Sequence, residues 1–207
     1  MAKSITLDNL LTVQLTLENA YDLETGLDVR DFVLPENNFK ELGKLEVVQK
    51  TSPQNDLDLA LIFDRDILSA FTGDLSADDD FQHRATSVVF EEISHFVYLA
   101  YNHNRGQNVT RLEMEIQSEV DRIILAFDER IAVPDNIRES LWLEFMEKNY
   151  LQPQYEEARR AALRFTRGLK SENPAAWSRC EKERLLRFFH GDLSQKLFLA
   201  SPKKNKP

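Results

Sequence analysis

The spacing of apolar residues changes near Asp66, and this change limits the folds open to the chain more than any other feature. Before it, residues 57–63 alternate between apolar and polar positions and end in a continuous apolar run, as a half-buried strand does. After it, apolar residues recur every three or four positions, which is the period of amphipathic helices. We therefore expect an α+β fold, in which a small N-terminal antiparallel sheet packs with five or six α-helices.

The boundaries of the expected elements follow from this pattern and from turn residues. Strands are expected over residues 31–34, 45–49 and 57–63, with Pro35 ending the first strand and turn-forming residues over 51–56. Residues 10–17 fit a strand or a helix, and we favour a helix. Further helices are expected over residues 67–71, 82–103, 110–130, 136–148, 154–170, 174–190 and 193–199. Thr110 and Glu113 have the spacing of a capping box at one of these helix starts.

The length of 207 residues suits one globular domain over residues 1–200, followed by a disordered basic tail over 201–207. Within that domain, residues 1–65 form the mixed part and residues 66–200 the helical part. No apolar run approaches 18 residues, and the first 20 residues lack the apolar block of a signal peptide. Cys180 is the single cysteine, so an intrachain disulfide and a Cys-rich zinc site are excluded. We expect a cytoplasmic protein.

The net charge of −9 is unevenly distributed along the chain. Residues 151–207 carry 13 Lys or Arg and 6 Asp or Glu, whereas residues 1–150 carry 13 and 29. A basic segment of this kind indicates either a surface for an anionic partner or helices that dock on the acidic part of the chain. The basic residues are interleaved with apolar ones at helical spacing, which favours docking. We expect no membrane or nucleic-acid partner, and the protein or peptide partner is unknown.

A possible metal site stands out in the helical part. Residues 91–95 read Glu-Glu-Ile-Ser-His, and Glu115 follows twenty residues after His95. The zinc motif His-Glu-x-x-His places two metal ligands one helical turn apart, with a general base between them. Glu91 stands where that motif has its first histidine, and a carboxylate also binds zinc.

The expected helices bring these residues to suitable positions. On a helical wheel, Glu92 falls inside an apolar arc, while Glu91 and His95 lie about 40° apart at its edge. An ionised glutamate among core residues is costly unless a cation or a metal accompanies it. Glu115 and Glu119 lie one turn apart along the margin of the next helix, and the short connection over residues 103–109 favours an antiparallel helical hairpin.

This arrangement resembles that of the gluzincin metallopeptidases, the thermolysin-like group, over residues 91–119. Those enzymes carry His-Glu-x-x-His on one helix and a glutamate ligand on the next. The resemblance implies zinc as the cofactor, with Glu91, His95 and Glu115 as ligands and Glu119 as a supporting residue. It implies hydrolysis by zinc-activated water whose proton Glu92 accepts as the catalytic base. The stretch Ser-His-Phe at 94–96, with the Glu-rich helix after it, also resembles a group of uncharacterised bacterial proteins.

Two interpretations of the function of these residues stay open. In the first, the chain is a zincin-like metal-binding protein, a degenerate metallopeptidase. In the second, it is a non-enzymatic helical interaction or assembly module with a structural His95 and Glu92 cluster. The Glu92-x-x-His95 spacing also matches a di-iron ligand pair, but the chain contains no second Glu-x-x-His.

The last apolar stretch of the chain is expected to form core. It contains Phe188, Phe189, Leu193, Leu197 and Phe198 at helical spacing. A terminal amphipathic segment of this type is also suited to binding a partner chain.

Overall fold

The computed structural model describes residues 7–37, 43–49, 57–73, 78–127, 153–167 and 179–201. The chain forms two compact units, residues 1–107 and 108–207. The first unit contains a three-stranded mixed sheet and helices, and the described part of the second unit is helical. These features confirm the α+β class and the mostly helical character of the chain. No helix among the described residues is long and apolar enough to span a membrane.

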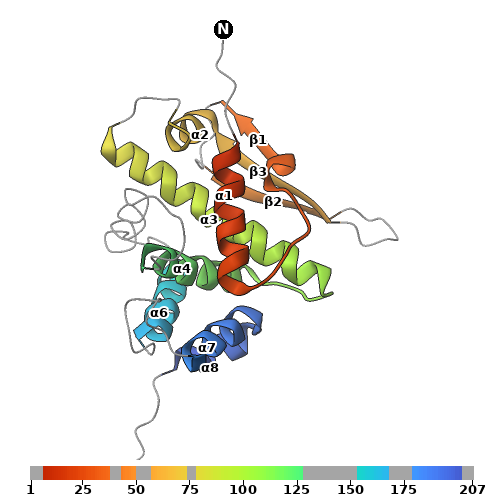
Figure 1. Cartoon of the computed structure of the whole chain (residues 1–207), viewed down its shortest axis with the longest axis vertical. Helices are drawn as coiled ribbons and strands as arrows, with labels where there is room; N and C mark the ends of the chain where they lie inside the picture. The colour runs from red at the N-terminus through yellow and green to blue at the C-terminus, as the bar shows by residue number, and fades with distance from the viewer. Residues whose placement is uncertain are drawn as a thin grey trace, which may run out of the picture. The chain divides into compact units, whose positions relative to one another are not determined.

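The first unit begins with a helix, continues through the sheet and ends in the longest described helix (Figure 1). Its elements are α1 (Asp8–Tyr21), the 3-10 helix η1 (Val29–Phe32), β1 (Val33–Glu36), β2 (Gly43–Gln49), β3 (Leu57–Asp64), α2 (Arg65–Phe71) and α3 (Asp79–Asn104). The helix favoured over residues 10–17 is confirmed, as are the helices expected over 67–71 and 82–103. The strands over 45–49 and 57–63 are confirmed, and the turn between them lies outside the described residues.

The strand order of the sheet is β1-β3-β2. β2 and β3 pair antiparallel, whereas β1 pairs parallel to β3, so the sheet is mixed and not wholly antiparallel as expected. The most apolar strand takes the centre, where Leu61 and Phe63 are fully buried. Pro35 lies within β1 and pairs with Phe63, so it does not end the strand as predicted. An edge strand tolerates proline, because a missing N–H on the solvent side breaks no hydrogen bond.

The inner face of the sheet packs against α3, and the two approach each other closely at Gly43. A Cβ at Gly43 would stand 2.5 Å from Cγ1 of Val88 on α3 and 3.0 Å from Cδ1 of Phe63. Neither neighbour moves away easily, since valine is restricted to one main rotamer in a helix and Phe63 is fully buried. Glycine at this position therefore sets the distance between the strand and the helix.

We expect Gly43→Ala to destabilise the protein by about 1–3 kcal/mol, the usual cost of overpacking. Adding Val88→Ala removes the clashing methyl groups, so the double variant should recover part of the loss. Urea unfolding followed by far-UV circular dichroism measures the coupling between the two sites in a double-mutant cycle. If the destabilisation of the double variant equals the sum of the two single destabilisations, the close approach of Gly43 and Val88 is contradicted.

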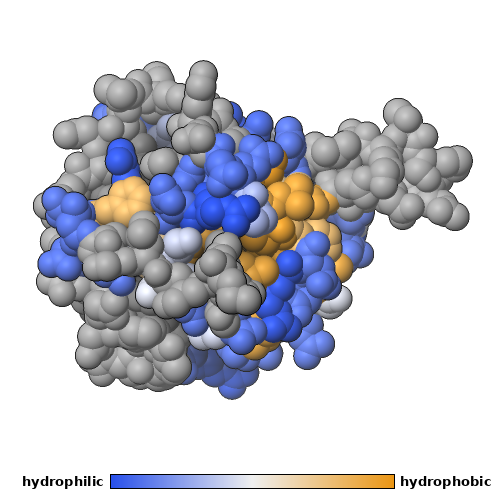
Figure 2. Space-filling model, turned by 90° about the horizontal axis from the view of Figure 1, so that it is seen from above, coloured by the Kyte–Doolittle hydropathy of each residue, from blue (hydrophilic) through white to orange (hydrophobic). Residues whose placement is uncertain are grey.

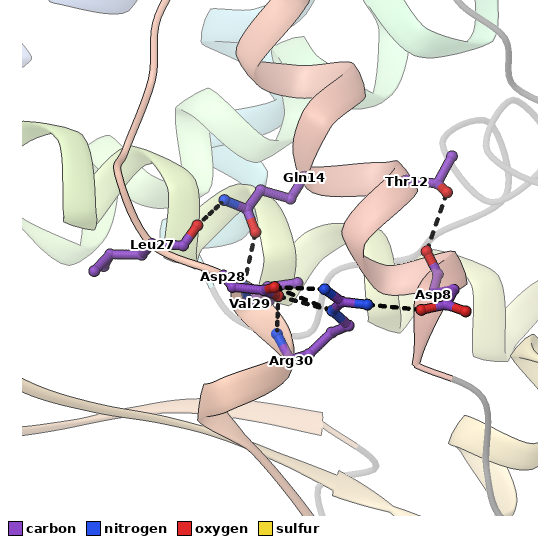
Figure 3. A network of polar contacts seen from close by, with 7 residues as sticks. All are labelled: Asp8, Thr12, Gln14, Leu27, Asp28, Val29 and Arg30. Atoms are coloured by element: carbon purple, nitrogen blue, oxygen red, sulfur yellow. Dashed lines mark hydrogen bonds and ion pairs between the residues drawn. The ribbon is translucent and has the colours of Figure 1, made fainter.

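The buried side-chain amide of Gln14, on α1, binds the segment that follows this helix (Figure 3). The side chain of Gln14 is almost fully buried, and its Oε1 accepts a hydrogen bond from the Val29 backbone N–H at 2.8 Å. Its Nε2 donates to the Leu27 carbonyl at 2.6 Å and lies 2.8 Å from Oε1 of Glu18. Thr25 donates to the same carboxylate oxygen of Glu18 at 2.6 Å. The segment between α1 and η1 is thus positioned by side chains of α1.

An exposed cluster of ion pairs joins the end of the same segment to the start of α1 (Figure 3). Arg30 contacts Asp28 at 2.6 Å and Asp8, near the start of α1, at 2.7 Å. The hydrogen bond from Arg30 holds the pKa of the Asp28 carboxyl below its ordinary value, against the opposing effect of burial. Because these groups are solvent-exposed or partly so, the pairs contribute little stability by themselves.

One apolar residue of the sheet, Leu34, is exposed, whereas its partner Ile62 is buried. Leu34 of β1 pairs in register with Ile62 of β3, so both side chains point to the same face, and Leu34 is 52% exposed. In the view of Figure 2, hydrophobic residues gather in one area of the surface and are bordered by hydrophilic ones. Lys44, which pairs with Ile62 from the other side, gives this face a polar margin.

The second unit contains four described helices. They are α4 (Arg111–Phe127), α6 (Pro153–Arg167), α7 (Arg179–His190) and α8 (Leu193–Ala200). The helices expected over 110–130, 154–170 and 193–199 are confirmed, and the helix expected over 174–190 is observed from residue 179 onward. The helix expected over 136–148 lies outside the described residues, as does the disordered tail expected over 201–207 except for Ser201.

The helices of the second unit pack through an apolar core. Ile116 and Val120 of α4 are fully buried, as are Ala162 and Phe165 of α6. The ring of Phe165 stacks on Phe188 of α7 with centroids 4.0 Å apart. Such buried stacked aromatic pairs contribute about 0.5–1.5 kcal/mol beyond the area that they remove from water.

Candidate functional site

The helix that carries the 91–95 motif is well defined at both ends. Asp78 caps α3 by accepting a hydrogen bond from the Phe81 backbone N–H at 2.8 Å, and Asp79 and Asp80 follow in the first turn. Acidic groups at this end are stabilised by the helix dipole. Val89, Ile93 and Phe96 form a fully buried stripe along α3, and such a stripe fixes the rotation of the helix and the direction of its polar side chains.

His95 and Glu92 form a close pair at the margin of this stripe. The imidazole Nδ1 lies 3.7 Å from Oε2 of Glu92, and the side chains are 8% and 13% exposed. Glu92 thus lies next to a nearly buried imidazole on its own helix, a polar neighbour at a position that is otherwise apolar. In the neutral imidazole one nitrogen donates and the other accepts. The contact with Glu92 involves Nδ1, and Nε2 is the other ring nitrogen.

Glu91, the predicted first ligand, is half-buried on α3, one turn before His95. Residues four positions apart on a helix have neighbouring side chains. The first unit therefore places one imidazole and two carboxylates within one turn of one helix.

Glu115 and Glu119, the predicted third ligand and supporting residue, lie on α4 in the second unit, and both are buried. The Oε1 atom of Glu115 is 3.5 Å from Nε of Arg111, one turn earlier on the same helix. This is a weak contact by hydrogen-bond geometry, and the Arg111 side chain is largely exposed. Arg111 also donates a hydrogen bond to the Tyr155 hydroxyl at 2.7 Å.

The capping box predicted at the start of α4 is confirmed. The Glu113 carboxylate accepts hydrogen bonds from the Thr110 backbone N–H at 2.7 Å and from its hydroxyl at 2.6 Å. In return the Thr110 hydroxyl oxygen accepts a hydrogen bond from the Glu113 backbone N–H at 3.2 Å. Glu113 thus has a structural role that needs no further chemistry.

The predicted ligand set combines residues of both units, Glu91 and His95 from the first and Glu115 from the second. Within the described ranges, no group of three or more His, Cys, Asp or Glu side chains is gathered in a way that would hold a metal ion. The three-ligand set, with Glu92 as base, accordingly stays a prediction of the sequence.

A second polar cluster, at Lys196, has no counterpart in the sequence analysis. Lys196 of α8 is fully buried, and its Nζ donates to Oε1 of Gln117 at 2.6 Å and to the Phe188 carbonyl at 2.8 Å. Gln117 in turn donates to Oδ1 of Asp121 at 2.6 Å. Burial lowers the pKa of Lys196 to about 7, against the opposing attraction of Asp121 and Glu113.

The burial of Lys196 corrects one expectation about the C-terminal core. Phe188 and Phe189 are buried as predicted, but Phe198 is 78% exposed. Residues two positions apart on a helix point about 200° from one another. When Lys196 turns inward, Phe198 therefore turns outward. An apolar count alone suggests the opposite rotation, because it assigns lysine to solvent and phenylalanine to core.

No model of a known protein family matches this chain, and comparisons with curated proteins and with solved structures found no match.

Proposed function

We propose that this chain is a metal-binding protein that uses His95 as its central ligand, with zinc as the metal that the donor types favour. The supporting observation is the placement of a nearly buried imidazole next to a carboxylate on α3. Metal-binding histidines usually present one nitrogen to the metal and direct the other toward a carboxylate or a carbonyl. Nitrogen and carboxylate oxygen donors suit zinc.

The remaining ligands in this proposal follow the motif. Glu91 is one turn from His95, and the sequence adds Glu115 as the third ligand and Glu119 as its support. Glu92 lies next to Nδ1 of His95, where a carboxylate can orient the imidazole. The motif instead assigns to Glu92 the role of general base in zinc-dependent hydrolysis. The two roles predict different results when Glu92 is replaced.

Near-stoichiometric zinc is expected in protein purified without chelator, and His95→Ala should lose it while the far-UV circular dichroism spectrum is retained. Elemental analysis and zinc titration measure the occupancy and the affinity. His83→Ala is the matched control, since His83 is a half-buried histidine on the same helix. Wild-type protein that holds no metal and takes up none on titration would contradict the proposal.

Glu92→Gln separates the two roles of this carboxylate. If Glu92 orients the imidazole, the variant should bind zinc about 10–100-fold more weakly, as is typical when such a partner is removed. If Glu92 is a base, zinc affinity should stay near wild type and only hydrolysis of peptide substrates should be lost. Glu115→Gln tests the third ligand in the same titration.

A second candidate is a non-enzymatic helical module in which these polar groups are structural. It is favoured by the contacts that some of them already make within the protein, such as Glu115 with Arg111 and Glu92 with His95. In that case His95→Ala should lower the free energy of unfolding with no metal involved, because Glu92 loses its buried partner.

A further inference from the structure

A groove of about 420 Å³ lies between α7 and α8 in the second unit. Arg187 of α7 and Ser194, Gln195, Phe198 and Leu199 of α8 line it. The volume is within the range of about 300–1,000 Å³ that is usual for ligand sites. The aromatic ring of Phe198 and the guanidinium of Arg187 offer an apolar contact and a positive charge at the same place.

The rotation of α8 keeps Phe198 exposed to solvent. On the opposite side of this helix, Lys196 is anchored inside by two hydrogen bonds and lies over the ring of Phe188 at 4.4 Å. Asp192 and Gln195 form a complete capping box at the start of α8. At its end, Arg184 of α7 donates to the Leu199 carbonyl at 2.8 Å.

These contacts hold α8 at its start, middle and end, so the groove is preformed and does not depend on a frayed terminus. The turn between the helices has no room for a side chain at Gly191. A Cβ at Gly191 would stand 3.0 Å from the Arg187 carbonyl oxygen and 3.0 Å from Cβ of Gln195. A preformed site loses less conformational entropy when a ligand binds.

The charged residue that lines the groove, Arg187, is basic. Arg184 and Arg187 lie one turn apart on α7, and burial, followed by the nearby charge of Arg187, lowers the pKa of Arg184. Cys180 and Glu181 act on that pKa in the opposite direction. The groove lining contains no carboxylate among its described residues, and residues 151–207 carry 13 basic and 6 acidic side chains. An anionic group of a partner would meet complementary charge here.

We propose that this groove binds an acidic peptide segment of a partner protein, with an aromatic or aliphatic side chain against Phe198 and a carboxylate at Arg187. Arginine binds carboxylates through paired, charge-assisted hydrogen bonds. The hydroxyl of Ser194 and the amide of Gln195 add polar contacts for a peptide. The site is concave, and a groove suits a protruding side chain better than the flat surface of a membrane.

A displayed library of random twelve-residue peptides, selected on the immobilised full chain, tests this proposal. We expect the enriched peptides to combine Asp or Glu with Phe, Trp or Leu. The strongest of them, made with a fluorescent label, should bind wild-type protein with an affinity that falls as salt is raised. Phe198→Ala and Arg187→Glu should each weaken this binding about tenfold or more, the loss typical of central interface residues.

Two variants serve as matched controls. Arg160→Glu makes the same charge change at an exposed site on α6, and Leu34→Ala shortens an exposed apolar residue of the first unit. Both should bind the labelled peptide within about twofold of wild type, as expected for surface sites away from an interface. No enrichment, enriched peptides without acidic residues, or binding unaffected by Phe198→Ala would overturn the proposal. Binding to anionic lipid vesicles or to RNA that Phe198→Ala abolishes would overturn it too.

Discussion

The second unit should become more stable as the pH rises from 7 to 10.5, and Lys196→Met should lose this increase. The pKa of Lys196 is about 7 in the folded protein and 10.5 in its unperturbed state. Between these values the unfolded chain binds a proton that the folded chain does not, so the free energy of unfolding rises with pH. The rise is up to about 5 kcal/mol, at 1.4 kcal/mol for each unit of pKa difference.

The neutral amine of Lys196 keeps its structural role at high pH, since two N–H groups suffice for Gln117 and the Phe188 carbonyl. Urea unfolding between pH 7 and 10.5 measures the effect. Far-UV circular dichroism follows the loss of the helices. Lys182→Met, at an exposed lysine of α7, should keep the wild-type slope, and equal slopes for wild type and Lys196→Met would contradict the prediction.

Gln14→Leu is expected to destabilise the first unit by about 2–4 kcal/mol, because it leaves several buried hydrogen-bonding groups without partners. Leucine fills a similar volume but accepts nothing from the Val29 N–H and donates nothing to the Leu27 carbonyl. The segment between α1 and η1 should therefore loosen before the rest of the unit unfolds.

Amide hydrogen exchange measures this loosening directly. The amide of Val29 should exchange faster in Gln14→Leu by a factor that matches the loss of stability. Gln107→Leu makes the same substitution at an exposed position and should leave that amide protected. Unchanged protection of Val29 in Gln14→Leu would show that other contacts hold the segment.

The helices were readable from the sequence because their signals are local. The apolar spacing of α3 and the Thr110 and Glu113 capping box depend on residues within a few positions of each other. The parallel pairing of β1 with β3 joins segments that are separated by β2, and no local pattern specifies it. The sequence therefore predicted β2 and β3, but not the bounds, the order or the direction of β1.

The average burial preferences of residue types predict the wrong orientation for α8. Lysine is rarely buried and phenylalanine usually is, so an average preference places Lys196 outside and Phe198 inside. The reverse holds because Gln117 and the Phe188 carbonyl accept both hydrogen bonds of the amine. Those acceptors come from α4 and α7, distant in sequence. The closeness of Glu92 and His95 could be predicted, since it depends on helical spacing alone.

The two outer strands of the sheet have a consequence for behaviour in concentrated solution. An open strand edge is a template on which another chain can add a strand and begin to aggregate. Pro35 removes a backbone donor from β1, and β2 carries the charged pair Lys44 and Glu46. Proline and charge at sheet edges oppose such templating. Pro35 on one edge and the charged pair on the other thus oppose polymerisation through the sheet.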